Sequence, residues 1–122
     1  MYKATIEKAS KELTAREKLQ AKNVRTASQI DELSKSADPT FTPVWYAILN
    51  IENDESDNKE YQNIIISTSD KGLLYTGSDS FITSFCEIFD TMKEEGDEEF
   101  SIRVSRIKSK NFNGDYLFAD II

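Results

Sequence analysis

Residues 100–122, FSIRVSRIKSKNFNGDYLFADII, are the segment from which the fold of this chain is most directly predicted. Apolar residues occupy alternate positions on both sides of its centre: Phe100, Ile102 and Val104, then Leu117, Ala119 and Ile121. Alternation with a period of two is typical of strands with one buried face. Between the two runs lies Asn113-Gly114, a pair that tolerates the positive φ angles of a tight turn. The segment therefore predicts a β-hairpin.

The remaining positions of this segment combine cations with aromatic rings. The first strand and the loop carry four cations and no acid, and the loop and the second strand carry three aromatics: Arg103, Arg106, Lys108 and Lys110, then Phe112, Tyr116 and Phe118. Cations on a hairpin can hold a phosphate backbone while bases stack on neighbouring rings. The alternative is a solvated strand face with some aromatics buried by a neighbouring segment, since mixed faces are common in antiparallel sheets. The hairpin alone leaves both interpretations open.

The composition limits the class of protein. A chain of 122 residues is long enough for one domain with a single core. The single cysteine excludes an internal disulfide, and the absence of histidine removes histidine-based catalysis and histidine-ligated metals. No stretch approaches the roughly 20 apolar residues of a membrane span, and residues 1–13 lack the apolar run of a secretory signal. We expect a cytoplasmic protein with no membrane contact.

The net charge of −7 is unevenly distributed along the chain. Residues 51–99 contain three Lys or Arg and fourteen Asp or Glu, whereas residues 101–122 contain four basic and two acidic residues. Residues 1–40 contain eight basic and six acidic residues. A basic face can still act locally on an acidic protein, because the electrostatic screening length is about 8 Å at physiological salt.

The N-terminal residues predict a basic, helical extension. Thr14-Ala15-Arg16-Glu17 fits a capping box, in which a hydroxyl and a carboxylate satisfy the free amides of a helix start, so a helix is predicted over residues 14–23. The residues before it are expected to form a further helical turn or a mobile arm. A short helix is predicted within residues 26–36, ending before Pro39. We therefore predict an extension over residues 1–39 and the main domain over residues 40–122.

The main domain predicts strands and one strong helix. Residues 43–51, 60–68 and 73–76 have the composition and period of strands. In residues 78–92, Phe81, Phe85 and Phe89 recur at helical spacing, and Gly96 is a candidate C-terminal cap. With the hairpin, the order is β-β-β-α-β-β, which is that of the OB-fold. The predicted fold is mainly β with α: a five-stranded, OB-fold-like antiparallel barrel with an N-terminal helical extension.

The sequence contains only weak signals for a catalytic or metal site. Cys86 lies inside the predicted helix beside Phe85 and is interpreted as a small buried hydrophobe. The acidic stretch of residues 54–60 lacks the glycine and the distal glutamate of a calcium loop. No glycine loop that could cradle a phosphate is present, and nothing selects a catalytic pair of carboxylates. We predict a protein that is not an enzyme and has no cofactor or bound metal.

Residues 64–122 resemble the small single-stranded DNA-binding proteins of protein-primed tailed phages of Gram-positive bacteria. The resemblance is carried by short pieces: Asp70-Lys71-Gly72, Leu74-Tyr75, a helix started by Ser78, Phe100-Ser-Ile-Arg-Val, Ser109-Lys110, Asn113-Gly114 and Tyr116-Leu-Phe. It implies an OB-type barrel that coats displaced single strands during phage DNA replication in the host cytoplasm. It points to Tyr75, Arg103, Lys110 and Tyr116 as DNA contacts and to replication proteins as further partners. Residues 1–39 and the acidic loop of residues 53–60 depart from the family pattern.

Together these observations predict a protein that binds single-stranded DNA without sequence preference. The predicted contacts line one shared trough: Tyr46, Tyr61, Tyr75, Arg103, Arg106, Lys108, Lys110, Phe112, Tyr116 and Phe118. The alternative is an acidic phage-encoded protein-binding module, or an inhibitor of a host nucleic-acid-binding protein, that uses residues 51–99. A homo-oligomer is also left open, in which the basic residues 1–25 dock on the acidic middle of a neighbouring copy.

Overall fold

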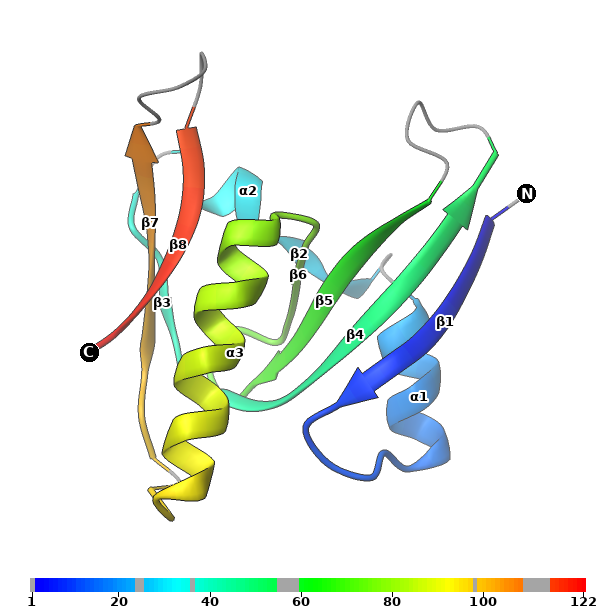
Figure 1. Cartoon of the computed structure of the whole chain (residues 1–122), viewed down its shortest axis with the longest axis horizontal. Coiled ribbons are helices and arrows are strands. Elements are labelled where there is room, and N and C mark those ends of the chain that lie inside the picture. The colour runs from blue at the N-terminus through cyan, green and yellow to red at the C-terminus, as the bar shows by residue number, and fades with distance from the viewer. Residues whose placement is uncertain (1, 24–25, 36, 55–59, 98, 109–114) are drawn as a thin grey trace.

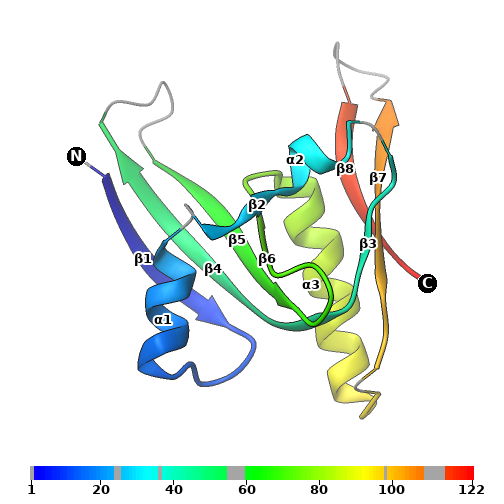
Figure 2. The ribbon, with the colours of Figure 1, turned by 180° about the vertical axis from the view of Figure 1, so that it is seen from behind.

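The computed structural model describes residues 2–23, 26–35, 37–54, 60–97, 99–108 and 115–122. Within these residues the strands form two open sheets, one of five strands in the order β1-β4-β5-β6-β2 and one of three in the order β3-β7-β8. Helix α3 lies between the two sheets, and α1 covers the opposite face of the five-stranded sheet (Figures 1 and 2). The chain is therefore a mixed α/β protein built mainly from strands.

The elements follow one another as β1 (Tyr2–Ala9), α1 (Ala15–Lys22), β2 (Ser28–Gln29), α2 (Ile30–Leu33), β3 (Thr40–Phe41), β4 (Pro43–Asn53), β5 (Glu60–Thr68), β6 (Leu73–Thr76), α3 (Asp79–Glu94), β7 (Ile102–Lys108) and β8 (Asp115–Ile121). The strands predicted at residues 43–51, 60–68 and 73–76, the hairpin and the long helix are confirmed. In the part of the chain that the structure describes, no helix is both long and apolar enough to cross a membrane.

The prediction of helix or a mobile arm before residue 14 is wrong, because residues 2–9 form strand β1. This strand pairs antiparallel with β4, and Ala4 lies opposite Ile51 and Ile6 opposite Leu49. Ala4 and Ile6 also pack against the apolar cluster under α1. β4 offers an edge whose backbone groups need partners, and this distant pairing decides the conformation of residues 2–9.

Helix α1 is confirmed together with its capping box. The hydroxyl of Thr14 accepts a 3.2 Å hydrogen bond from the Glu17 amide, and the Glu17 carboxylate accepts a 2.9 Å bond from the Thr14 amide. Lys11 lies 2.8 Å from the Glu17 carboxylate, and its hydrogen bond is the main cause that lowers the pKa of that carboxyl, followed by the Thr14 amide. The sequence signal was sufficient here because every group in it is local.

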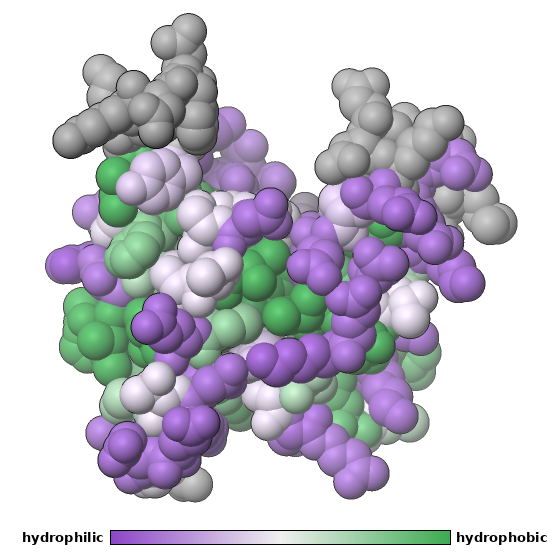
Figure 3. Space-filling view, viewed as in Figure 1, coloured by the Kyte–Doolittle hydropathy of each residue, from purple (hydrophilic) through white to green (hydrophobic). Residues whose placement is uncertain are grey.

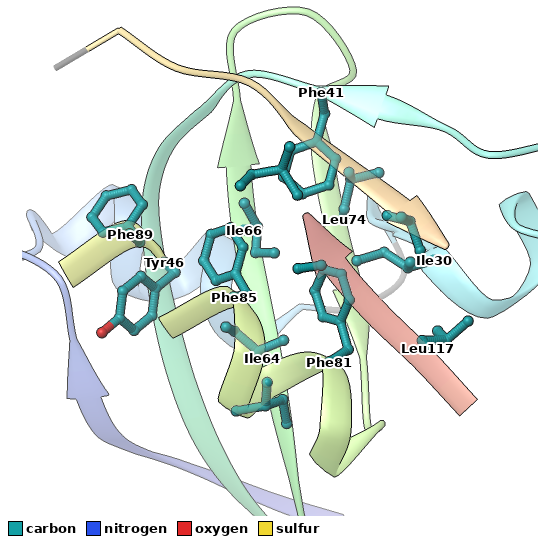
Figure 4. Packing of buried hydrophobic residues seen from close by; sticks show 14 of the residues in the cluster. Ile30, Phe41, Tyr46, Ile64, Ile66, Leu74, Phe81, Phe85, Phe89 and Leu117 are labelled. Atoms are coloured by element: carbon teal, nitrogen blue, oxygen red, sulfur yellow. The ribbon is translucent and has the colours of Figure 1, made fainter. Parts of the chain in front are cut away.

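Helix α3 fills the main core between the sheets (Figure 4). The Phe85 ring lies 5.9 Å from the Phe81 ring, 6.2 Å from Phe41 of β3 and 5.7 Å from Tyr46 of β4. The helix ends at Glu94 and is followed by the predicted cap glycine, Gly96, whose φ of 75° suits glycine. The amide of Asp97 donates to the Met92 carbonyl, and that of Gly96 donates to the Lys93 carbonyl, which is a Schellman cap.

The prediction of a closed five-stranded barrel is wrong for the described residues, because β6 and β8 do not pair. The free edge of β8 is instead bonded to α3: the Ser80 hydroxyl donates to the Leu117 carbonyl at 2.8 Å, and the Ser84 hydroxyl accepts from the Ala119 amide at 3.0 Å. The outer edge of β6 pairs with the short parallel strand β2. Both edges that closure would need therefore have other partners.

The described residues before Pro39 pack against the rest of the chain. β1 and α1 lie on the five-stranded sheet, β2 extends it, and Ile30 of α2 is fully buried in the main core. The division into an extension and a main domain at residue 39 stays a prediction. The described residues before Pro39 have few apolar side chains of their own. They are ordered because those side chains pack on apolar surface that the sheet supplies.

Candidate nucleic-acid interface

The outer face of the β7–β8 hairpin, which we call the hairpin face, carries three of the predicted contacts: Arg103, Tyr116 and Phe118. Side chains alternate between the two faces of a strand. Val104, Leu117 and Ala119 are buried toward α3. The positions of opposite parity form the hairpin face: Arg103, Ser105, Ile107, Tyr116, Phe118 and Asp120.

Cross-strand pairing fixes the arrangement of the hairpin face. Phe118 lies opposite Ser105, and Tyr116 lies opposite Ile107. Both aromatic side chains are partly exposed, and every ring pair among the described residues lies in the core rather than on this face. Tyr116 and Phe118 therefore keep ring surface that a base could cover. Arg103 is exposed two positions along β7 from Ser105, with Asp120 as its opposite neighbour.

Arg106 is not part of this face, because it is turned inward to α2. Its Nε–H donates to the Ser34 carbonyl at 3.3 Å, and its terminal amino group donates to the Asp31 carbonyl at 2.7 Å. These carbonyls belong to the C-terminal end of a short helix, where backbone acceptors lack partners within the helix. Arg106 therefore has a structural role in joining β7 to α2, and it leaves the predicted cationic track.

Tyr61 and Tyr75 lie on a different surface from the hairpin face. Tyr61 is opposite Ile51 on β4, and Tyr75 is opposite Ile65 on β5. Both rings are half-buried and pack against the apolar cluster that α1 covers. They face away from α3, on the five-stranded sheet, whereas Tyr116 and Phe118 belong to the three-stranded sheet.

Tyr46 lies in the core, where no base can reach its ring. The side chain is fully buried, and its ring packs edge-on against Phe89 with centres 5.2 Å apart. Burial raises the pKa of Tyr46 well above its usual range. Cys86 of α3 is half-buried against the same core, and burial likewise raises the pKa of its thiol. A thiol held protonated is a poor nucleophile.

The other predicted contacts cannot be placed on either surface. The backbone of Lys108 lies at the end of β7 opposite Asp115, but the positions of these two side chains are outside what the structure describes. Lys110 and Phe112 lie in residues 109–114, which are also outside the described residues. The structure thus brings Arg103, Tyr116 and Phe118 together and separates them from the tyrosines of the other sheet.

The sequence-based prediction left out the uncharged residues of the hairpin face. It also placed on one face two arginines that a regular strand directs to opposite faces. Ser105 and Ile107 share the face with Arg103, and the same period of two that predicted the strand would have found them. Arg103 and Arg106 differ by an odd number of positions, so a regular strand cannot present both on one face.

No known family model, no curated protein and no solved structure matches this chain. The resemblance to phage single-stranded DNA-binding proteins therefore stays a prediction, and the functional argument depends on the geometry of the hairpin face.

Proposed function

We propose that this chain binds single-stranded DNA without sequence preference, as a phage replication protein would, and that the hairpin face is the binding surface. The observation that carries the proposal is the gathering of Arg103, Tyr116 and Phe118 on one sheet face, with both rings partly exposed. A guanidinium can follow the phosphate backbone, and rings accept any base because every base has a π-face.

The topology supports a nucleic-acid ligand as well. The order β4, β5, β6, α3, β7, β8 is the OB-fold order, and β3, which leads into β4, pairs with β7. We interpret the fold as an OB-like arrangement left open between β6 and β8. OB-folds bind oligonucleotides with the face of their second and third strands and with the loops that follow their first and fourth strands. Here β4 and β7, the strands in those two places, end on the same side of the molecule (Figure 1).

Glu52 and Glu60, two acidic residues of the β4–β5 hairpin that the structure describes, do not lie on the proposed surface. Glu52 and Glu60 are opposite one another, at positions whose parity matches Tyr46 and Ile64 on the α3 side of the five-stranded sheet. They are exposed at the strand ends, on the α3 side of a different sheet from that of Arg103. At physiological salt, screening over about 8 Å further limits their repulsion of a strand on the hairpin face.

The decisive experiment is a titration of labelled oligothymidine with the full chain at several salt concentrations. Replacing Tyr116 and Phe118 together by Ala is expected to weaken binding on the order of 100-fold, since stacking of one base contributes roughly 1–3 kcal/mol. The affinity of the unaltered protein is expected to fall as salt rises, because phosphate contacts release counterions.

The matched control replaces Tyr61 and Tyr75 by Ala, which removes two half-buried rings from the other sheet. Circular dichroism checks that both double variants are folded. A similar loss of affinity in the control would move the ligand away from the hairpin face. Equal affinity for duplex DNA, or no binding of oligothymidine at all, would reject the proposed function and leave the acidic protein-binding alternative.

A further inference from the structure

A groove runs between β1 and α1. It encloses about 450 Å³ and is lined by Thr5, Ile6, Ala9, Glu12, Leu13, Lys18 and Lys22. Thr5 and Ile6 are neighbours in β1, so their side chains point to opposite faces of the strand. Both can line one groove only if it follows the open edge of β1. The apolar side chains of Ile6, Ala9 and Leu13 form its floor.

The α1 side of this groove is basic and apolar. Lys18 and Lys22 line it, both are exposed, and within the described residues neither forms a salt bridge. Between them along the helix, Leu19 is 71% exposed, the largest exposure of any large apolar side chain in the described chain. The groove thus combines an apolar floor, the exposed Leu19 beside it and two cations that form no salt bridge with another described residue, which is the composition of a surface that binds an acidic and partly apolar partner.

The chain itself carries such a surface at the end of α3. Glu94, Glu95, Asp97 and Glu99 are exposed there, and none of them forms a salt bridge to another described residue. In Figure 3 the end of α3 is a hydrophilic patch at the lower left.

Apolar side chains lie close to these acids. The amide of Ile122 donates to the carbonyl of Ser101, two residues after Glu99, and Ile121 and Ile122 are 47% and 58% exposed. The end of β8 accordingly forms a hydrophobic margin in Figure 3 beside the acidic patch. Acidic and apolar side chains thus occur together, as the groove requires.

We propose that the groove between β1 and α1 binds the acidic end of α3, with Ile121 and Ile122, from a second copy of this chain. Lys18 and Lys22 would face Glu94 and Glu95, and the apolar floor and Leu19 would cover the isoleucines. The two surfaces differ and lie on opposite sides of the molecule (Figures 1 and 2). One chain cannot join them, so copies assemble head to tail.

A head-to-tail contact of this kind is heterologous, and it continues from copy to copy unless the rotation closes a ring. The assembly requires no DNA, so it is tested separately from the proposed function. The hairpin face contributes no residue to either surface, and its Arg103–Asp120 pair adjoins the pair of Ile102 and Ile121. A row of copies would then present a repeated set of Arg103, Tyr116 and Phe118 along one strand.

Light scattering of the full chain without DNA tests the proposal. At low salt the mass is expected to exceed that of one chain and to increase with protein concentration. Near 1 M salt, where the screening length is about 3 Å, the mass is expected to approach that of one chain. A mass of one chain at low salt, at the highest concentration that stays in solution, would overturn the proposal.

Charge reversal identifies the two surfaces. The double variants Lys18→Glu/Lys22→Glu and Glu94→Lys/Glu95→Lys are each expected to remain single chains, because each then presents two surfaces of like charge. An equimolar mixture is expected to assemble again, since the first variant keeps the acidic surface and the second keeps the basic groove. A mixture that stays at the mass of one chain would overturn the assignment.

The control for Lys18→Glu/Lys22→Glu is Lys35→Glu/Lys71→Glu, which makes the same change in net charge at exposed lysines outside the groove and also removes the exposed ion pair of Lys35 with Glu32. Its assembly is expected to equal that of the unaltered chain. If this control also dissociates, net charge rather than the groove governs the assembly and the proposal fails.

Discussion

The hydroxyl of Tyr46 donates a 2.9 Å hydrogen bond to a carboxylate oxygen of Asp90, and this bond joins β4 to α3. Lys8 of β1 completes the contact, with its ammonium 3.4 Å from the other Asp90 oxygen and 5.7 Å from the centre of the Tyr46 ring. Three elements far apart in the sequence therefore meet at one buried ring. The Tyr46 ring packs β4 against α3, and its hydroxyl has a hydrogen-bond partner, Asp90, at the margin of the core.

Replacing Tyr46 by Phe removes this hydrogen bond and leaves the ring in place. We expect the free energy of unfolding to fall by about 1–2 kcal/mol, because hydrogen bonds to charged groups contribute roughly 1.5–3 kcal/mol and Asp90 is partly exposed to water. Urea denaturation measures the change. The affinity for oligothymidine is expected to stay the same, and a folded variant that no longer binds DNA would contradict the assignment of this ring to the core.

The same tyrosine predicts how stability changes in alkaline solution. Burial is the main cause that raises the pKa of Tyr46, so the unfolded chain loses this proton at a lower pH than the folded chain. The resulting stabilisation is complete below about pH 10, the ordinary tyrosine pKa, and is lost as the pH rises further.

Urea denaturation of the unaltered protein and of Tyr46→Phe at a series of pH values isolates this effect. The stability difference between them is expected to shrink above about pH 10, by up to about 1.4 kcal/mol for each pH unit. A difference that stays constant up to pH 11 would show that the Tyr46 hydroxyl ionises equally well in both states.

The sequence predicted the elements whose signals are local. The capping box of Thr14 and Glu17, the helical spacing of Phe81 and Phe85, and the turn at Gly96 each involve residues within a few positions of one another. β1 could not be predicted in this way, because Ala4 and Ile6 make a weak pattern and their conformation depends on pairing with β4, about 45 positions away. The open sheets were missed for the same reason, since Ser80 and Ser84 gave no sign that they would bond to β8.

The candidate site was predicted in part, and the errors have a common physical cause. β4 is apolar at both parities, with Trp45 and Leu49 facing α1 and Tyr46 facing α3. A strand that is apolar at both parities indicates burial on both faces, which would have removed Tyr46 from the predicted contacts. Arg106 was misplaced because its hydrogen-bond partners lie in α2, more than 70 positions away.

The hydrogen bond between Ser84 of α3 and the buried edge of β8 predicts that replacing Ser84 lowers the stability of the fold. In Ser84→Ala the Ala119 amide loses its acceptor in a buried position. An unsatisfied buried donor costs roughly 1–3 kcal/mol, so the free energy of unfolding is expected to fall by about that amount.

The exposed neighbour Thr83 provides the control for this measurement, because Thr83→Ala changes the same helix without touching the sheet edge. Urea denaturation of both variants separates the two effects. A loss for Ser84→Ala that does not exceed the change for Thr83→Ala would show that the hydroxyl is not needed to satisfy the edge of β8.

Arg103 and Arg106 differ by three positions in β7 and are expected to behave in opposite ways. Arg103 is exposed on the hairpin face, so Arg103→Ala should leave the stability nearly unchanged and weaken oligothymidine binding. It should also reduce the steepness of the salt dependence by about one released counterion. Arg106→Ala leaves the Ser34 carbonyl without this donor, while the Asp31 carbonyl still accepts from the Ser34 hydroxyl, so it should lower the stability by roughly 1–3 kcal/mol.

Each arginine variant is the control for the other, since both remove one positive charge from the same strand. Urea denaturation measures the stability of each, and a salt series of oligothymidine titrations, run where both variants are folded, measures the binding. Because the Arg106 guanidinium points to α2, its loss should lower the affinity much less than the loss of Arg103. An equal decrease in affinity for the two would mean that the average charge of β7, rather than the hairpin face, determines DNA binding.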